Sequence, residues 1–160
     1  MIIDLTRLHE LNKWSVKNDS AMGGRSNAEI CFGNHQSIFK GNISVENKGG
    51  FSAVYRPMKP LFKDINNVVV DVTGDGQTYQ LTLIGKVNEY QLAYKHSFVT
   101  TAGKRQRVTF SLEDFVASFE GQTIVNAQIL RPENILETGF LLSKNSEGPF
   151  SLSVFSISFF

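Results

Sequence analysis

The sequence predicts an all-β protein in which two sheets pack face to face as a β-sandwich. Three observations predict this fold class. Apolar residues recur at every second position in several segments, which is the period of a strand with one buried face. Glycine-containing turn signals separate these segments at intervals of about 8–12 residues. No stretch carries the 3.6-residue period of a sizeable helix. The 160 residues are predicted to form one domain, 1–160.

The strands are predicted in chain order from this alternation. Segment 39–46 alternates apolar residues with Lys40, Asn42 and Glu46, which predicts a strand with one buried face and one solvent-exposed face. Segment 68–72 reads Val-Val-Val-Asp-Val and is predicted to be covered on both faces, which favours two packed sheets. Alternation returns in segments 78–83 and 90–98.

Turns are predicted at 22–24, 48–50, 74–76, 102–103 and 147–149. Gly74-Asp75-Gly76 lies between two strand patterns, which predicts a hairpin turn. A phosphate-binding loop is disfavoured because the downstream helix and lysine of such a loop are missing. Segment 112–119 is predicted to make one short helical turn, with Ser111 as its N-cap and Asp114 near the third position.

The last strand pattern contains a change of parity. Phe150, Leu152 and Val154 share one parity, whereas the apolar residues from Phe155 to Phe159 share the other. One extra residue in a strand moves the following side chains to the opposite face. The sequence therefore predicts a β-bulge between Val154 and Phe155.

Composition narrows the classes of function. The formal net charge is +1, which favours neither nucleic acid nor an anionic membrane surface as a partner. Cys31, in an apolar run, is predicted to be a small buried hydrophobe, and one cysteine allows no disulfide within the chain. Lys104, Arg105 and Arg107 are predicted to form a solvated turn. We find no secretory signal and no apolar run of membrane-spanning length, so a cytoplasmic location is expected.

Three segments are more particular than a generic sandwich requires. They are Trp14 followed by Asn18-Asp19-Ser20-Ala21-Met22-Gly23-Gly24-Arg25-Ser26, the run Asn47-Lys48-Gly49-Gly50-Phe51-Ser52, and Gly74-Asp75-Gly76 ahead of Tyr79-Gln80-Leu81. Two further segments are Phe98-Val99-Thr100-Thr101-Ala102-Gly103 and Gly148-Pro149-Phe150. With these five segments in this order, the chain resembles the family of complex I intermediate-associated proteins of the thirty-kilodalton type.

The resemblance covers nearly the whole chain, and it implies a galactose-binding-like jelly roll without catalysis. It also implies a protein partner, namely an assembly intermediate of a respiratory or other membrane complex. The residues that the motifs single out are expected to form one rim, at which alternative roles stay open: a binding surface, or ordered loops that close a sheet edge. They are Asn18, Asp19, Met22, Gly23, Gly24, Arg25, Asn47, Gly49, Gly50 and Phe51.

A small ligand such as a sugar is the alternative partner. Tyr90, Leu92, Tyr94, His96 and Phe98 share one parity, which is typical of a core strand. If this stripe faced outward, Tyr94 and the neighbouring pair Tyr79 and Gln80 would form a platform on which a sugar ring could stack. Residues of the opposite parity include Gln91 and Lys95, which could bond hydroxyl groups.

Metal and catalytic chemistry are weakly supported by the sequence. His9, His35 and His96 are scattered, and no cofactor is predicted. Asp19, Asp71 and Asp75 are conceivable calcium ligands, but no aspartate-rich loop contains them. Glu113 and Asp114 are adjacent and would diverge on a strand or on a helix, so we predict no enzyme.

Overall fold

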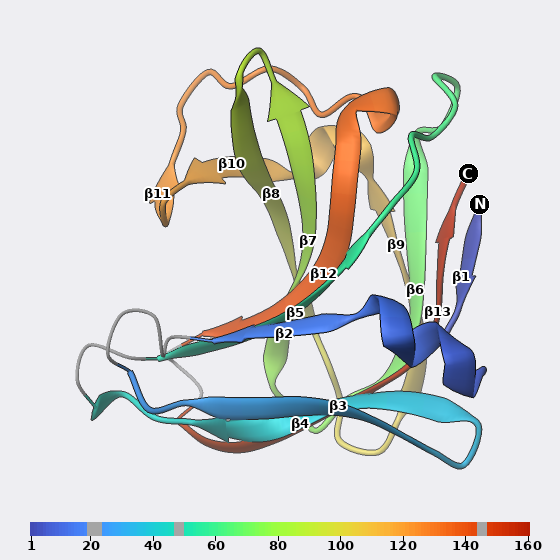
Figure 1. Cartoon of the computed structure of the whole chain (residues 1–160), viewed down its shortest axis with the longest axis vertical. Coiled ribbons are helices and arrows are strands. Elements are labelled where there is room, and N and C mark those ends of the chain that lie inside the picture. The colour runs from blue at the N-terminus through green and yellow to red at the C-terminus, as the bar shows by residue number, and fades with distance from the viewer. Residues whose placement is uncertain (19–23, 47–49, 144–146) are drawn as a thin grey trace.

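The computed structural model describes residues 1–18, 24–46, 50–143 and 147–160 of the chain. Two antiparallel sheets form a β-sandwich, which confirms the predicted fold class (Figure 1). The six-stranded sheet has the order β3-β4-β13-β6-β9, and β1 pairs with β13. The seven-stranded sheet has the order β11-β10-β8-β7-β12-β5-β2. No helix of the described residues is long and apolar enough to cross a membrane.

Each predicted strand segment contains a strand, but the segment 39–46 forms a strand only to Ile43, and Val45 is exposed. The six-stranded sheet consists of β1 (Ile2–Asp4), β3 (Asn27–Gly33), β4 (Gln36–Ile43), β6 (Asn67–Thr73), β9 (Arg105–Ser111) and β13 (Gly148–Phe159). The seven-stranded sheet consists of β2 (Ser15–Asn18), β5 (Phe51–Pro57), β7 (Thr78–Val87), β8 (Tyr90–Val99), β10 (Val116–Phe119), β11 (Gln122–Thr123) and β12 (Ile135–Ser143). The 3₁₀ turns are η1 (Leu8–Lys13), η4 (Leu112–Asp114) and η5 (Pro132–Asn134).

The core lies between the two sheets and is built from the inward parity of each strand. Strand β6 contributes Val68, Val70 and Val72, all fully buried. Its opposite face is also covered, because Val69 and Asp71 are each only 6% exposed. The predicted two-sided burial is therefore confirmed, and the apolar area removed from water is the main stabilising contribution.

The parity change in the last strand is a bulge, as predicted. Val154 pairs with Val72 and Ser156 pairs with Asp71, so Phe155 is an extra residue opposite β6. Before the bulge Phe150, Leu152 and Val154 are buried, and after it Ile157 and Phe159 are buried. The bulge thus keeps an apolar side chain on the core side along all of β13.

The segment Gly74-Asp75-Gly76 is not a hairpin, which corrects the prediction. Strand β6 belongs to the six-stranded sheet and β7 to the seven-stranded sheet, so this segment crosses between sheets. The crossing from β8 to β9 lies beside it, and the amide of Gly103 donates to the carbonyl oxygen of Gly74 at 3.1 Å. Local turn residues are the same for both kinds of connection, and only the strand pairing distinguishes them.

The carboxylate of Asp75 holds this crossing to the last strand. It accepts hydrogen bonds from the side-chain amide of Gln77 at 2.8 Å, the phenol of Tyr79 at 3.0 Å and the backbone amide of Ser151 at 2.9 Å. Asp75 is half-buried, and these partners satisfy its carboxylate oxygens. Asp75 therefore has a structural role here.

Three local predictions need correction. The helical turn after Ser111 is confined to η4, where Ser111 makes no side-chain cap bond, and residues 116–119 form strand β10 because they pair with β8. Cys31 is only partly buried, since β3 is an edge strand. Arg105 and Arg107 belong to β9 instead of a turn. Arg105 donates to Asp71 through two hydrogen bonds of 2.9 Å, and its guanidinium lies 3.7 Å from the ring centroid of Phe155.

Candidate binding groove

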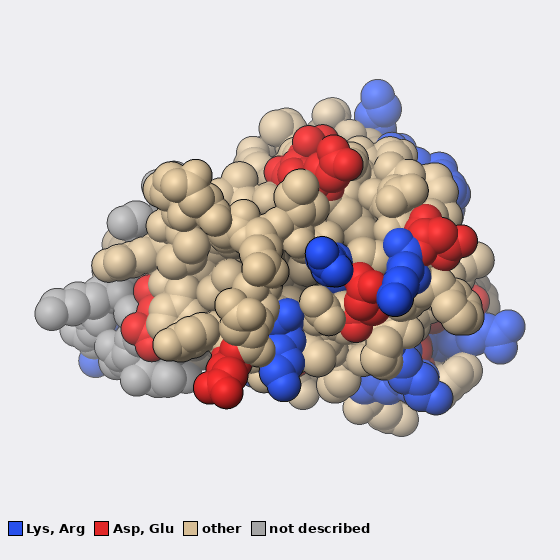
Figure 2. Space-filling view, turned by 90° about the horizontal axis from the view of Figure 1, so that it is seen from above, with Lys and Arg blue, Asp and Glu red and all other residues tan. Residues whose placement is uncertain are grey.

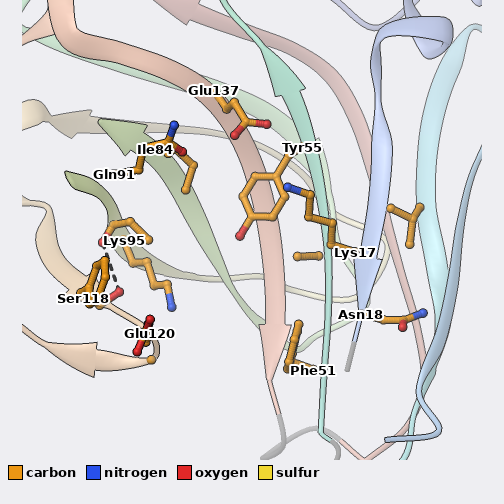
Figure 3. A pocket seen from close by; sticks show the side chains of 15 residues that line it. Lys17, Asn18, Phe51, Tyr55, Ile84, Gln91, Lys95, Ser118, Glu120 and Glu137 are labelled. Atoms are coloured by element: carbon orange, nitrogen blue, oxygen red, sulfur yellow. Dashed lines mark hydrogen bonds between the residues drawn. The ribbon is translucent and has the colours of Figure 1, made fainter. Parts of the chain in front are cut away.

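A groove of 730 Å³ crosses the outer face of the seven-stranded sheet (Figure 3). Strands β5, β12, β7 and β8 form its floor, β2 lies along one side, and the turn between β10 and β11 lies along the other. Its lining consists of Val16, Lys17, Asn18, Phe51, Ala53, Tyr55, Ile84, Gln91, Ala93, Lys95, Ser118, Phe119, Glu120, Gly121 and Glu137.

The floor of the groove contains an aromatic ring that lies over a glycine. Tyr55 on β5 pairs with Gly139 on β12, and Gly139 pairs with Thr82 on β7. A Cβ atom at position 139 would lie 2.6 Å from Cδ1 of Tyr55 and would collide with the carbonyl oxygen of Val54. The absence of a side chain at Gly139 is thus what lets the ring occupy the middle of the sheet. In Figure 3 the phenol of Tyr55 points toward the wall that carries Lys95.

The Tyr55 phenol keeps its proton at neutral pH. Burial and the nearby charge of Glu137 raise the pKa of Tyr55 to about 12, and the hydroxyl of Thr82 beside it partly offsets this rise. The Thr82 hydroxyl is itself buried beneath the floor of the groove. A neutral phenol can both donate and accept a hydrogen bond, so the floor offers an aromatic face together with polar groups.

The walls carry charged side chains of both signs. Lys17 and Glu137 lie on the β2 and β12 side, and the Lys17 amine is 5.3 Å from the ring centroid of Tyr55. Lys95 and Glu120 lie on the opposite side. Glu120 is in the left-handed region with φ +50°, and Gly121 follows with φ +81°, which gives the two-residue turn that joins β10 to β11.

A second hollow of 470 Å³ continues the groove past β8. It shares Lys95, Ser118 and Gly121 with the groove. Its other lining residues are mainly polar: Gln80, His96, Ser97, Asp114, Val116 and Thr123. Burial lowers the pKa of Lys95, which lies where the two hollows meet. A ligand in the groove can therefore extend toward a polar second site without leaving the sheet.

A different surface, the apolar tip, lies at the end of the sandwich that Figure 2 views. Tyr90 begins β8 after the turn from β7 and is 62% exposed, and Val125 and Ile129, in the segment that follows β11, are 80% and 66% exposed. In Figure 2 the charged side chains at this end stand in separate groups between uncharged ones. A hollow of 290 Å³ opens beside Tyr90 and is lined by Val87, Asn88, Tyr90, Leu92, Phe119 and Ile124. We define the apolar tip as Tyr90, Phe119, Ile124, Val125 and Ile129.

The segment that carries the apolar tip is held by contacts to the core. The phenol of Tyr94 donates to the carbonyl oxygen of Gln128 at 2.8 Å. Leu130 is buried, and a Cβ atom at position 85 would lie 2.7 Å from its Cδ1, so Leu130 packs against Gly85. Ile129 is thus exposed between anchored neighbours, and its exposure does not result from a loose segment.

The aromatic stripe on β8 faces the core, as its parity indicated, so the platform that was conditional on an outward stripe does not form. Tyr94 and Phe98 are 1% and 5% exposed, and Tyr79 on β7 is fully buried. Burial, together with Asp75, raises the pKa of Tyr79. Tyr79 and Tyr94 therefore cannot contact a ligand directly. Gln80 lines the second hollow, while Gln91 and Lys95 of the opposite parity line the groove.

The structure places part of the predicted rim on the groove. Asn18 and Phe51 line it at the ends of β2 and β5. Arg25 lies 3.9 Å from the carboxylate of Glu46, with both side chains exposed, and Gly50 is buried with φ +134°. Gly24 is half-buried. Asp19, Met22, Gly23, Asn47 and Gly49 lie outside the described residues.

The conceivable calcium ligands have protein partners where the structure describes them. Asp71 is bound by Arg105, and Asp75 is bound by the amides and phenol of the sheet crossing. Asp19 lies outside the described residues. No group of three or more His, Cys, Asp or Glu side chains that could hold a metal occurs within residues 1–18, 24–46, 50–143 and 147–160.

Sequence reasoning missed Tyr55, Glu120 and Glu137. Tyr55 stands in a run of predominantly apolar residues, Phe51 to Val54, whose parity does not reveal which face is the core. The useful signal would have been Gly139, because an isolated glycine inside a strand pattern indicates a close approach by another group. A glycine at this position indicates where another group comes close, but it does not indicate that the group is Tyr55. That contact depends on the pairing of β5 with β12.

Comparison with known proteins places this geometry among related sandwiches. The model of the family described as Complex I intermediate-associated protein 30 matches residues 3–154. The family 11 carbohydrate-binding module of the cellulosomal cellulase Lic26A-Cel5E of Clostridium thermocellum superposes with a TM-score of 0.67 at 12% identity, covering 91% of this chain and 86% of the module.

Two further structures support the same fold. The Clostridium thermocellum family 11 module in complex with a β-1,3-1,4-mixed-linked tetrasaccharide gives a TM-score of 0.66 at 12% identity, covering 91% of this chain and 88% of that chain. A family 29 carbohydrate-binding module variant gives 0.56 at 7% identity, covering 98% and 89%. At these identities the likeness concerns the fold alone.

Proposed function

The chain belongs to the family of Complex I intermediate-associated protein 30, and on that premise we propose that it is a non-catalytic module that binds a protein partner during assembly of a respiratory or other membrane complex. The single observation that favours a protein partner is the apolar tip. The exposed Tyr90 and Ile124 line one apolar hollow together with Phe119, and the exposed Val125 and Ile129 belong to the same segment of chain as Ile124. Clustered exposed apolar residues of this kind are typical of interaction sites.

The apolar tip has the features of an interface centre. Aromatic and aliphatic side chains that fill a pocket supply most of the binding energy in protein interfaces. Tyr90 contacts Phe119 edge to face, with ring centroids 5.8 Å apart, so these two rings form a firm wall of the hollow. An apolar side chain of the partner would enter this hollow, while Val125 and Ile129 would be covered around it.

A pull-down from membranes of the native host tests this proposal. We expect the whole chain to recover a subunit of a membrane complex, and the double variant Val125→Asp/Ile129→Asp to lose it. Thr109→Asp is a matched control because Thr109 is exposed on β9 of the other sheet. Failure of the unmodified chain to recover a defined partner would contradict the proposal, and so would equal recovery by the double variant.

A small-ligand function for carbohydrate is the second candidate, and the groove with Tyr55 on its floor favours it. An aromatic face next to hydrogen-bonding side chains is the combination by which proteins hold sugar rings. A glycan array and a thermal-shift screen with the whole chain test this candidate, and the absence of a hit in both would remove it.

A further inference from the structure

We propose that the groove binds an uncharged oligosaccharide of at least two pyranose rings, with one ring stacked on Tyr55 and the next in the polar second hollow beyond Lys95. This inference rests on the second function proposed above and names its ligand class and the positions of its rings. It concerns the outer face of the seven-stranded sheet, and among the described residues Phe119 lines both the groove and the hollow at the apolar tip.

The Tyr55 ring is positioned so that a ligand can stack on one of its faces. Gly139 lies beneath it, so the ring occupies the floor with one face against the backbone. The other face is directed to the groove, where the Lys17 amine lies over it at 5.3 Å. Lys17 is on an exposed edge strand and has a flexible side chain. A sugar ring can therefore take its place on the aromatic face, and the amine can then donate to a ring hydroxyl.

Hydrogen-bonding side chains surround the place where a sugar ring would stack on Tyr55. Glu137 accepts hydrogen bonds, Lys95 donates them, and Gln91 does both. The Tyr55 phenol stays protonated, so it can both donate and accept a hydrogen bond at the same place. This chemistry suits a ring that carries several hydroxyl groups.

Among the described residues, the groove lining carries equal numbers of positive and negative side chains. These are two lysines, Lys17 and Lys95, and two glutamates, Glu120 and Glu137. Their formal charges cancel, so a polyanion would meet the glutamates and a polycation would meet the lysines. An uncharged ligand avoids both penalties while still bonding to all four side chains. We therefore expect neutral glycans to bind more tightly than uronate-containing ones.

The distance across the groove sets the minimum length of the ligand. Tyr55 on β5 is separated from Lys95 on β8 by β12 and β7. At strand spacings of about 4.8 Å, this separation is roughly 14 Å, which is longer than one pyranose ring. The second hollow then continues from Lys95 to Gln80 and Asp114. A ligand that uses both the aromatic floor and this polar hollow must contain more than one ring.

Calorimetric titration of the whole chain tests the proposal. The probes are glucose, cellobiose, cellotetraose and mixed-linked β-glucan as neutral ligands, and polygalacturonate and alginate as charged ones. We expect binding of the tetrasaccharide to exceed that of glucose, and neutral probes to exceed charged ones. Tyr55→Ala should weaken tetrasaccharide binding by about tenfold or more, because a stacking ring is lost.

Matched variants make the result decisive. Phe62→Ala removes an exposed aromatic ring that lines neither the groove nor the second hollow, and it should bind the tetrasaccharide as the unmodified chain does. Lys95→Ala should weaken the tetrasaccharide more than it weakens glucose, since Lys95 joins the two hollows. Circular dichroism melting of each variant verifies that it is folded.

The outcomes separate this inference from the function on which it rests. Sugar binding that Tyr55→Ala leaves unchanged, or a preference for the charged polymers, would overturn the inference while the carbohydrate function stands. Absence of binding to every glycan on the array and to all six probes would overturn both. The double variant Val125→Asp/Ile129→Asp must retain sugar binding, since loss there would place the ligand at the apolar tip instead.

Discussion

Two neighbouring residues on β5 face opposite sides of the same sheet and have opposite surroundings. Arg56 points inward and is 9% exposed. It donates to the carboxylate of Glu10, which is 5% exposed, and to the carbonyl oxygen of Pro57 at 2.7 Å. Tyr55 points outward into the groove, where its ring contacts the backbone of Gly139 and the amine of Lys17.

The difference shows how one strand separates stability from recognition. The inward charge has every partner inside the protein, so its loss would damage the fold. The outward aromatic ring is positioned by the fold, but one of its faces and its phenol stay directed at the groove. Substitutions on the two faces should therefore have different effects on unfolding and on binding.

The largest effect is expected from Arg56→Ala. Among the residues that the structure describes, it leaves the buried carboxylate of Glu10 with one charged partner, the Lys13 amine at 3.4 Å. Breaking one side of a buried ion pair costs about 3–5 kcal/mol of unfolding free energy. Urea unfolding followed by circular dichroism measures it. The double variant Glu10→Leu/Arg56→Met should restore most of the loss, because replacement of both charges leaves none unpaired. A change below that of ordinary surface variants would contradict this view of the inward face.

A smaller effect is expected from Gly139→Ala on the floor of the groove. The new methyl group would collide with the carbonyl oxygen of Val54, which is backbone and cannot swing aside. Overpacking of this kind costs about 1–3 kcal/mol. The same methyl would displace the Tyr55 ring, so sugar affinity should fall together with stability. Gly33→Ala is the matched control, since a Cβ atom there meets nothing within 4 Å.

A pH-dependent effect of about 1 kcal/mol is expected from Tyr55. Its pKa in the folded chain is raised to about 12 from the ordinary 10, so the folded state keeps a proton that the unfolded state loses between these values. The unfolding free energy should therefore fall as pH rises above 10, and at pH 11 it should be about 1 kcal/mol lower than at pH 9. Urea unfolding of the unmodified chain and of Tyr55→Phe at pH 9 and pH 11 measures it. The phenylalanine variant should lose less stability over this interval, and equal losses would contradict the buried phenol.

Much of the fold could be predicted because it depends on side-chain parity. The valine strand and the bulge at Phe155 both follow from which side chains must face the core. The sheet crossing at Gly74–Gly76 could not be predicted, because its turn residues suit a hairpin equally well. The choice depends on the pairing of Val72 with Val154 and Gln106, far away in the chain.

The groove was less predictable than the fold for a related reason. The motif glycines indicated loops, and of the residues proposed there Asn18 and Phe51 line the groove. Tyr55, Glu120 and Glu137 come together only because β2, β5, β12, β7, β8 and β10 are neighbours in the curved sheet (Figure 1). Tyr94 was a candidate only if its stripe faced outward, and an aromatic stripe has the same pattern whether it faces the core or the solvent.

The smallest effect on the unfolding free energy is expected from Lys17→Ala, which tests the difference between the inward and outward faces of β5. Lys17 is exposed and contributes a cation–π contact worth about 0.5–1 kcal/mol at such sites. Its removal should change the unfolding free energy by no more than that, yet it should weaken tetrasaccharide binding about two- to fivefold through one lost hydrogen bond. Lys40→Ala is the control, because Lys40 lies on the other sheet and pairs with Glu29 at 3.7 Å. Urea unfolding and calorimetric titration of both variants measure the two effects separately. If Lys17→Ala destabilised the chain as strongly as Arg56→Ala, the outward face of β5 would be part of the structural framework and the proposed division between the two faces would be wrong.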